Sequence, residues 1–242
     1  MRRQACITGG TKGIGKAVAS ALGRAGYDLL LTYASDADAA GEVCRALEKE
    51  LQVEVRALRA DITDRRSIDT IYHYLIDNEL RLDAVVFNAG LTLRDSFETI
   101  KIEDWERVFF GNVHFPVFLL QRIAGLLNAG GSVVFTGSLM GIHPHAVSLA
   151  YGVTKSAVHA LVKNLVKFLS PYDIRVNGVA PGFVDTEWQK GKPADIRRNI
   201  ESKIASSRFC DPAEVAEVYR MLVENGYING EVIVVDGGYS YR

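Results

Sequence analysis

The chain alternates short, apolar runs rich in β-forming residues with longer segments whose apolar residues recur at helical spacing. The apolar runs cover residues 5–8, 28–33, 53–61, 84–88, 132–137, 174–180 and 231–238. The helical segments between them cover residues 13–25, 37–51, 65–79, 104–127 and 151–169. Near-continuous apolar strands separated by amphipathic helices are typical of buried parallel strands joined by right-handed crossovers. The pattern predicts an α/β fold in which a doubly wound parallel sheet of about seven strands carries helices on both faces.

Composition limits the number of domains and the class of partner. A chain of 242 residues with 48% hydrophobic residues can bury one large core, so we expect a single domain over residues 1–242. The formal net charge is -1 and basic residues cluster only in pairs, which argues against nucleic acid and anionic membranes as partners. Three cysteines without metal-binding spacing, no signal-like start and no long apolar run favour a cytoplasmic protein without disulfides, metal sites or membrane spans.

A glycine-rich turn follows the first predicted strand. It reads TGGTKGIG from Thr8 to Gly15 and leads directly into the first predicted helix. Glycine allows positive φ angles and lets a phosphate approach the backbone N–H groups at the positive end of a helix. The GxxxGxG spacing differs from the common GxGxxG fingerprint. Taken alone, the cluster indicates either a phosphate-binding turn or a tight strand-to-helix connection.

Together with later motifs, this turn resembles that of the short-chain dehydrogenase/reductase family. The turn matches the family pattern TGxxxGxG, Asn88-Ala89-Gly90 matches its NAG motif, and INGEVIVVDGGYS matches its last strand and Gly-Gly turn. The resemblance covers nearly the whole chain, is nearest to the 3-oxoacyl-carrier-protein reductase type, and implies a Rossmann-like fold. Taken singly, the NAG motif is equally well explained as a turn that ends a strand, and Asp61 as the cap of the next helix.

The resemblance implies a set of residues that hold a nicotinamide dinucleotide. The NAG motif would border the adenine pocket, Asp61 would contact the adenine amine, and a PG motif within APGFVDTEW would border the nicotinamide. Pro-Gly on its own is simply a turn. The implied cofactor-binding residues are Thr8, Gly9, Thr11, Lys12, Gly13, Ile14, Gly15, Tyr33, Ser35, Asp61, Ile62, Asn88, Ala89, Gly90, Tyr151, Lys155, Pro181, Gly182, Val184 and Thr186.

Four further positions match the family's catalytic set: Asn112, Ser138, Tyr151 and Lys155. Each has a structural explanation on its own, namely a satisfied helix amide, a turn residue, an interface aromatic and a solvated charge. Their joint occurrence in the family's order, with the YxxxK spacing intact, favours function. The resemblance implies that Ser138 and Tyr151 bond a substrate carbonyl oxygen, that Tyr151 transfers the proton, and that Asn112 holds a water linked to Lys155.

The YxxxK spacing places the Lys155 ammonium near the Tyr151 phenol, because residues i and i+4 are neighbours on a helix. A phenol with a pKa of about 10 needs a fall of about 3 units, or about 4 kcal/mol, to act as an acid or base near neutrality. A unit charge about 4 Å away supplies about 4 kcal/mol at an effective dielectric constant of about 20. We therefore expect Lys155 to lower the pKa of Tyr151 and, in line with the resemblance, to bind the ribose of the cofactor.

The end of the second predicted strand distinguishes NADP(H) from NAD(H). An NAD-type site places a carboxylate there, which accepts from the ribose 2′-hydroxyl. The discriminating position here is Tyr33, which is uncharged, while Lys12 in the turn and Ser35 could contact a 2′-phosphate. These residues favour NADP(H). A one-residue shift of the comparison would bring Asp36 into the site and favour NAD(H) instead.

The polar segment 187–210 is expected to form a mobile lid over the substrate, with Trp188 and Phe209 as apolar walls. Trp188 suits an exposed interface anchor equally well. The resemblance implies a small-molecule substrate with a carbonyl or alcohol group, and ketones, oxoacyl thioesters, sugars and polyols remain open. Few basic residues stand in LLNAGGS and SPYDIR, where the family's carrier-protein reductases are basic. An acidic carrier protein would find few basic residues to dock on, so a substrate attached to such a protein is less favoured.

Three other functions remain open: a non-catalytic NADP(H)-binding sensor, a sugar-nucleotide epimerase-like enzyme, and an interaction scaffold. The segment 151–169 has one apolar stripe and a second face of small residues, which indicates burial from two sides. We therefore expect a homo-oligomer, either a dimer or a tetramer. The stripe consists of Val158, Leu161, Val162, Leu165 and Leu169, and the small-residue face of Val153, Ala157 and Ala160.

Overall fold

Seven parallel strands form one sheet in the order β3-β2-β1-β4-β5-β6-β7, in a computed structural model that describes residues 2–144 and 148–242. The prediction of a doubly wound sheet is confirmed. The strands are β1 Arg3–Ile7, β2 Tyr27–Tyr33, β3 Val55–Arg59, β4 Leu82–Phe87, β5 Leu127–Thr136, β6 Arg175–Pro181 and β7 Val232–Val235.

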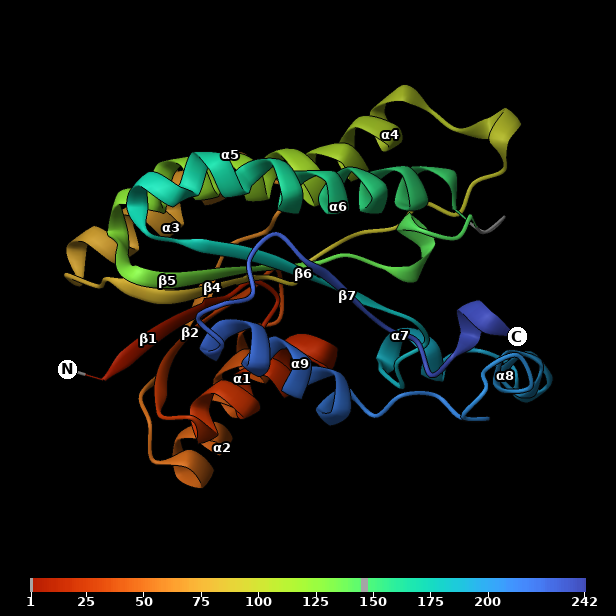
Figure 1. Ribbon diagram of the computed structural model, residues 1–242, viewed down its shortest axis with the longest axis horizontal. Helices are drawn as coiled ribbons and strands as arrows, with labels where there is room; N and C mark the ends of the chain where they lie inside the picture. Colours follow the sequence, from red (N-terminus) through yellow and green to blue (C-terminus); the bar gives the residue numbers. More distant parts are fainter. Residues whose placement is uncertain (1, 145–147) are drawn as a thin grey trace.

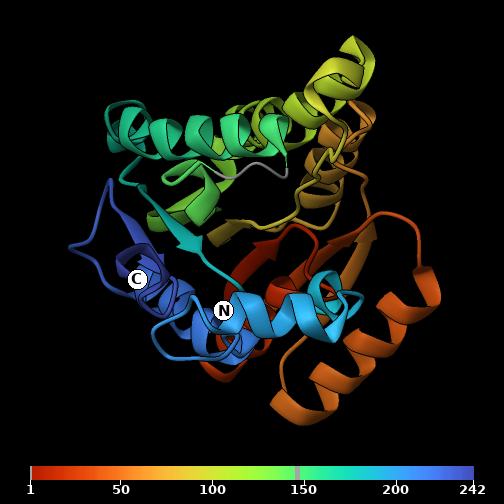
Figure 2. The same cartoon turned by 90° about the vertical axis from the view of Figure 1, so that its right-hand side faces the viewer.

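Helices cover both faces of this sheet. One layer contains α1 Gly13–Arg24, α2 Ala37–Leu51 and α9 Pro212–Glu224, and the opposite layer contains α3 Arg66–Asp77, α4 Ile102–Phe109, α5 Phe115–Ile123 and α6 Leu149–Leu169 (Figures 1 and 2). Two short helices, α7 Glu187–Lys190 and α8 Ala194–Glu201, lie beyond one end of the sheet. In the part of the chain that the structure describes, no helix is both long enough and apolar enough to span a membrane.

The central parts of the strands are largely apolar because both faces of the sheet are covered there. In β2, Leu29 and Leu31 belong to the core on the α1, α2 and α9 side, whereas Leu30 belongs to the core on the α3, α5 and α6 side. Successive side chains of a strand point to opposite faces of the sheet, so a two-sided sheet needs apolar residues at every position. This explains the near-continuous hydrophobic runs in the sequence.

The predicted helix over residues 104–127 is interrupted in the structure. A π-helical turn, η2 Phe110–His114, separates α4 from α5, and β5 already begins at Leu127. Single π-helical turns within α-helices occur frequently at functional sites. This turn contains Asn112, so the interruption places a candidate site residue where the regular helix is broken.

Helix α9 was not predicted from the sequence. Asp211 begins it with a capping box, in which the Asp211 side chain accepts a backbone bond and Glu214 accepts from the Asp211 N–H. Its buried residues, Val215, Ala216, Tyr219, Leu222 and Val223, have the spacing of one helical face, and the helix packs against α1 and β5. The sequence signal was therefore present, but it lay between the proposed lid and the last strand.

Candidate active site

The glycine-rich turn leaves the start of α1 open to an anion. Gly9 and Gly13 have φ angles of 63° and 53°, a region that favours glycine. The helix begins after Lys12 without a side-chain cap, and its first turn holds no acidic residue. Its first backbone N–H groups therefore have no partner from such a cap, which is the arrangement that binds phosphate. A Cβ on Gly13 would lie 3.3 Å from Thr186 Cγ2, so this approach stays clear only with glycine.

The glycine turn and the NAG motif form one hydrogen-bonded unit. Thr8 Oγ1 accepts from the backbone N–H groups of Asn88 (3.0 Å) and Ala89 (3.1 Å). In return, Asn88 Nδ2 donates to the carbonyl oxygens of Thr8 (3.0 Å) and Gly9 (3.2 Å). A Cβ on Gly15 would overlap the Gly9 oxygen and lie 2.6 Å from Asn88 Nδ2. The polar groups of Thr8 and Asn88 thus brace the turn. A nicotinamide dinucleotide fits the open cradle that they support.

Ser138 and Tyr151 come together at the carboxyl end of β5. Ser138 is buried in the loop that follows the strand, and its Oγ accepts from Met140 N at 3.2 Å. Tyr151 lies in the first turn of α6, whose N-cap Ser148 accepts the Tyr151 N–H at 3.3 Å. The Ser138 side chain lies near enough to the Tyr151 phenol to counter the rise in its pKa that burial causes. The two hydroxyls therefore form a pair that can face one substrate oxygen.

Lys155 lies one helical turn after Tyr151 and is buried, with an exposed fraction of 3%. Its Nζ donates to the Thr136 carbonyl oxygen at 2.6 Å and lies 5.4 Å from the centre of the Tyr151 ring. The Tyr219 hydroxyl of α9 donates to Thr136 Oγ1 at 2.8 Å. A Cβ on Gly90 would lie 3.3 Å from Asn112 Oδ1 and 3.5 Å from Lys155 Nζ. Gly90, Asn112 and Lys155 therefore converge beside Tyr151.

The expected effect of Lys155 on Tyr151 is not what the structure shows. Burial raises the pKa of the Tyr151 phenol, while the nearby Ser138 side chain acts in the opposite direction. The Lys155 ammonium bonds the Thr136 carbonyl instead, and burial lowers the pKa of Lys155 to about 8. Lys155 is not among the groups that shift the pKa of Tyr151 in this arrangement, and its effect on the phenol stays a prediction. A raised pKa keeps the phenol protonated, as a proton donor must be.

Asn112 braces the loop after β4 against α6. Its Nδ2 donates to the Leu91 carbonyl oxygen (2.9 Å) and to Thr154 Oγ1 (3.0 Å), and its Oδ1 accepts from Leu91 N (2.8 Å). Both amide hydrogens are therefore in use within the protein. The π-helical turn that carries Asn112 is thus bonded to both of its neighbours.

The end of β2 shows what the carboxylate of Asp36 does. Its Oδ1 accepts from Ala39 N at 3.0 Å and caps α2. Tyr33, the last residue of β2, pairs in register with Arg59 of β3, whose Nε donates to the Ala34 carbonyl oxygen at 3.1 Å. Arg59 and Asp61 line a cavity of about 490 Å³ at this end of the sheet. The cationic side chain of Arg59 therefore lies beside the end of β2, where the sequence left the choice between NADP(H) and NAD(H) open.

The remaining predicted cofactor residues lie in the glycine turn and in the loops that follow β2, β3 and β6. Asp61 Oδ1 accepts from the N–H (2.8 Å) and hydroxyl (2.9 Å) of Thr63, and Ile62 is buried. Thr11 and Ile14 are half-buried at the glycine turn, whereas Lys12 and Ser35 are exposed. At the end of β6, Gly182 N donates to the Val235 oxygen at 2.9 Å. Buried Val184 forms an isolated bridge with Cys210 that closes the base of segment 187–210.

The two aromatic residues proposed as substrate walls differ in position. The Trp188 ring of α7 lies edge-on to the Tyr151 ring, with centroids 6.2 Å apart, and the residue is 48% exposed. Phe209 is instead buried against the Phe183 ring (5.9 Å) and the Arg197 guanidinium (4.2 Å). Trp188 is therefore placed to border a substrate. Phe209 is not, because it packs beneath the segment.

Comparisons with known proteins agree with this architecture. The family model described as enoyl-(acyl carrier protein) reductase matches residues 9–240. A solved short-chain dehydrogenase/reductase from Serratia marcescens is 30% identical, with a TM-score of 0.92 over 98% of each chain. The chain belongs to the short-chain dehydrogenase/reductase family.

Relatives of this short-chain dehydrogenase/reductase include enzymes with an assigned reaction. A 3-oxoacyl-[acyl-carrier-protein] reductase from Thermotoga maritima is 32% identical over 239 residues, which cover 96% of this chain and 95% of the relative. An uncharacterized oxidoreductase from Bacillus subtilis is 30% identical over 243 residues, or 99% of both chains. A short chain dehydrogenase from Burkholderia cenocepacia in complex with NADP is 28% identical, with a TM-score of 0.91 over 98% of both chains.

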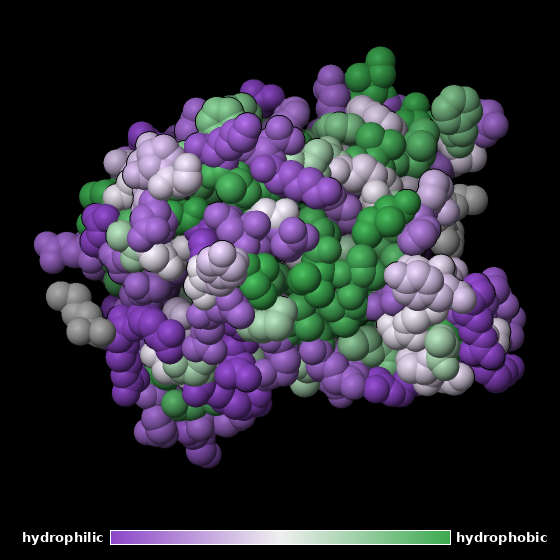
Figure 3. Space-filling model, in the orientation of Figure 1, coloured by the Kyte–Doolittle hydropathy of each residue, from purple (hydrophilic) through white to green (hydrophobic). Residues whose placement is uncertain are grey.

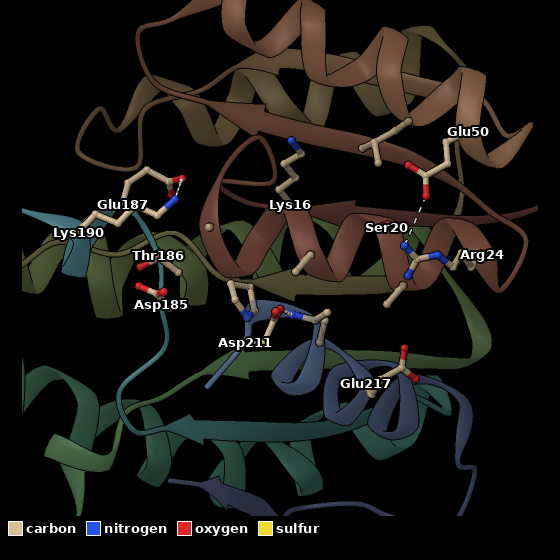
Figure 4. A pocket seen from close by; sticks show the side chains of 17 residues that line it. Lys16, Ser20, Arg24, Glu50, Asp185, Thr186, Glu187, Lys190, Asp211 and Glu217 are labelled. Carbon is tan, nitrogen blue, oxygen red and sulfur yellow. Dashed lines mark hydrogen bonds and ion pairs between the residues drawn. The ribbon is translucent and has the colours of Figure 1, made fainter. Parts of the chain in front are cut away.

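A second cavity of this short-chain dehydrogenase/reductase lies on the outer side of α1 (Figure 4). It has a volume of about 330 Å³ and is bordered by α1, the start of α9 and the segment around Thr186. Lys16, Arg24, Asp185 and Glu217 give it charges of both signs. Its lining includes the predicted cofactor-binding residues Gly13 and Thr186 but none of Ser138, Tyr151 and Lys155, so it adjoins the glycine turn and not the serine-tyrosine edge.

Two residues next to the site were missed by the sequence analysis. Arg59 stands two residues before Asp61, and its position at the end of the third predicted strand could have indicated it. His159 follows Lys155 by one helical turn, and its Nε2 accepts the Ser138 N–H at 3.2 Å. A histidine on the face of the Tyr/Lys helix was a visible signal, but its partner lies in a distant loop.

Proposed function

We propose that this protein is an NADP(H)-dependent oxidoreductase that interconverts a carbonyl and a secondary alcohol, with Tyr151 as the acid and base. The observation that supports this most directly is the convergence of buried Lys155 and Asn112 beside Tyr151, with buried Ser138 at the carboxyl end of β5. The turn Thr8–Gly15 would hold the pyrophosphate, and the cofactor-binding residues inferred from the sequence would contact the rest of the dinucleotide. A bound nicotinamide would supply the hydride.

Each of the four predicted catalytic residues would have a distinct task in the proposed reduction. Ser138 and Tyr151 donate hydrogen bonds to the carbonyl oxygen and orient it, and Tyr151 gives up its proton as negative charge develops there. Lys155 is well placed to reprotonate the phenol or to bind a ribose hydroxyl once its ammonium leaves the Thr136 carbonyl. Asn112 holds the loop that follows β4 at a fixed distance from α6 through its bonds to Leu91 and Thr154.

The preference for NADP(H) is supported by the charges at the end of β2. Asp36 is engaged as a helix cap, and Arg59 at the end of β3 and exposed Lys12 in the glycine turn are cations that would face a 2′-phosphate. Solved relatives described as complexes with NADP or NADPH share the fold at 26–28% identity. We propose small ketones or 3-oxoacyl thioesters as substrates, because the Thermotoga maritima relative is a 3-oxoacyl reductase.

We further propose that the protein forms a homo-oligomer in the cytoplasm. The predicted apolar stripe of α6 is buried or half-buried, whereas Val153 and Ala160 of its second face are exposed. Apolar side chains gather in the middle of the face shown in Figure 3, over the edge strand β7, whose Val234 is 42% exposed. Both surfaces suit a second copy of this chain. Light scattering that shows a monomer at micromolar concentration would contradict this proposal.

The test of the catalytic proposal is oxidation of NADPH by the purified protein against a panel of ketones and oxoacyl thioesters. The Tyr151→Phe variant removes the proton donor and keeps the ring, so kcat should fall by about a thousandfold. NADPH binding, measured by fluorescence titration, should stay within about twofold. Wild-type turnover in Tyr151→Phe would refute the role of Tyr151. Tight NADPH binding without turnover of any substrate would favour a sensor.

A further inference from the structure

His159 reaches from α6 to the main chain of Ser138. The residue lies two helical turns after Tyr151 and one after Lys155, and it is only half-buried. Its Nε2 accepts the backbone N–H of Ser138 at 3.2 Å. Ser138 itself is buried, with an exposed fraction of 8%. A buried N–H that loses its partner is left unsatisfied at a free-energy cost, so this contact helps to determine where the serine loop rests.

The imidazole ring fills a space that two glycines leave for it. A Cβ on Gly137 would overlap His159 Nε2, and a Cβ on Gly141 would lie 2.8 Å from His159 Cε1. Gly137 precedes Ser138, and Gly141 ends the turn Leu139–Gly141, which Ser138 begins in an extended conformation with φ -167° and ψ 150°. The ring is thus wedged between the two ends of the serine loop, and any shift of the loop towards α6 would meet it.

The protonation state of the ring suits an acceptor. Burial, with a contribution from the ammonium groups of Lys155 and Lys163, lowers the pKa of His159 to about 4. The imidazole is therefore neutral near pH 7, with a lone pair on Nε2 and its proton on Nδ1. An apolar residue in its place would fill much of the space but would leave the Ser138 N–H without an acceptor.

A second bond holds the other end of the same loop. The Ser156 hydroxyl of α6 donates to the Gly141 carbonyl oxygen at 2.8 Å. This bond is three residues from Ser138 and does not contact it. Ser156 therefore provides a matched control, because its loss loosens the loop at Gly141 and leaves the Ser138 N–H bonded.

We propose that His159 is a positioning residue, which fixes the main chain at Ser138 and thereby aims the Ser138 hydroxyl at the substrate oxygen. This inference rests on the proposed carbonyl reduction. Ser138 Oγ accepts from Met140 N, so the serine is held on both sides: His159 fixes its backbone and Met140 its side-chain oxygen. The hydroxyl proton is left to point towards Tyr151 and the substrate. A small displacement of such an oriented group is enough to lower a rate strongly.

The test combines two substitutions at His159 with a double-mutant cycle. His159→Leu, which removes the acceptor, should lower kcat about tenfold and leave the affinity for NADPH unchanged. His159→Gln offers a carbonyl oxygen to the same N–H, and it should restore at least half of the lost activity. In a Ser138→Ala background, His159→Leu should lower kcat by less than twofold, because the group that it positions is already missing.

The control variant Ser156→Ala should lower kcat by the same factor with and without Ser138→Ala. The inference is overturned if His159→Leu keeps wild-type kcat. It is equally overturned if the effects of His159→Leu and Ser138→Ala simply multiply, because a general structural role would act in that way. If Ser138→Ala itself retains full activity, the proposed function fails instead. The single Ser138→Ala variant therefore separates the two failures.

Discussion

The glycine turn and the serine-tyrosine edge of the site are built in opposite ways. At the turn, side chains are missing: Gly9, Gly13 and Gly15 leave space, and the backbone supplies the N–H groups. At the edge, side chains supply the function, and Lys155 is buried with its charge bonded to a main-chain carbonyl. The turn is therefore sensitive to an added atom, and the edge is sensitive to a lost polar group. The same sheet supports both solutions because each lies at the carboxyl end of its strand.

The largest expected effect follows from adding one methyl group to the turn. Gly15→Ala places a Cβ against the Gly9 carbonyl oxygen and Asn88 Nδ2, so the unit formed by the turn and the NAG motif has to open. We expect a loss of about 3 kcal/mol in the free energy of unfolding and no detectable NADPH binding. Thermal denaturation and fluorescence titration measure the two effects.

The matched control is Gly125→Ala, where an added Cβ meets nothing within 4 Å. It should leave both stability and NADPH affinity unchanged. Equal losses in the two variants would mean that the space at Gly15 is not what makes the turn special.

Removing the buried charge from the edge should have an effect that depends on pH. In the folded protein the pKa of Lys155 is about 8, against an ordinary value of 10.5. Between these values the unfolded chain binds more protons, so the stability of the wild type rises with pH, by about 3 kcal/mol in all. Lys155→Met lacks this contribution. Urea denaturation should therefore show the wild type gaining stability relative to Lys155→Met as the pH rises from 8 to 10.5.

The same variant should be inactive, so the edge carries its function at a cost in stability. A stability difference between wild type and Lys155→Met that stays constant over this pH range would contradict the buried-charge interpretation of the edge.

A smaller effect is expected where the cofactor site extends beyond the turn. Arg59→Met removes a cation from the end of β3, and we expect the KM for NADPH to rise about tenfold while the KM for NADH stays unchanged. Steady-state kinetics with both cofactors measure this directly. Arg24→Gln, which removes a cation at the far end of α1, is the control and should change neither constant. An equal rise for NADH would show that Arg59 does not contact a 2′-phosphate.

The smallest effect is expected at Asp36. Asp36→Ala removes the N-cap of α2, which should cost about 1 kcal/mol of stability. The ratio of the KM values for NADPH and NADH should not change, because the carboxylate serves the helix and not the cofactor. A shift of this ratio towards NADPH would instead place Asp36 in the cofactor site.

The sequence predicted the turn more completely than the edge. The glycines, Thr8 and Asn88 are close to their strands along the chain, so their spacing predicts their positions. The interruption of the helix over 104–127 depends on Asn112 meeting Leu91 and Thr154, which are distant in sequence. For the same reason His159 and Arg59 were missed, and burial of Phe209 could not be read from a polar segment. The features that the sequence did not predict, and the burial that raises the pKa of Tyr151, all depend on contacts between elements that are distant in sequence.

The isolated bridge between Val184 and Cys210 has a consequence for protein engineering. Backbone bonds from Cys210 N to Phe183 O and from Asp185 N to Cys210 O, each 2.9 Å, fix both ends of segment 187–210 side by side. An insert anchored in this way can change in length and sequence with little loop-closure cost. Tyr151 and Lys155 are held by α6 and β5, outside the insert. Exchanging this segment between relatives is thus a route to new substrate ranges with the proton-transfer residues left in place.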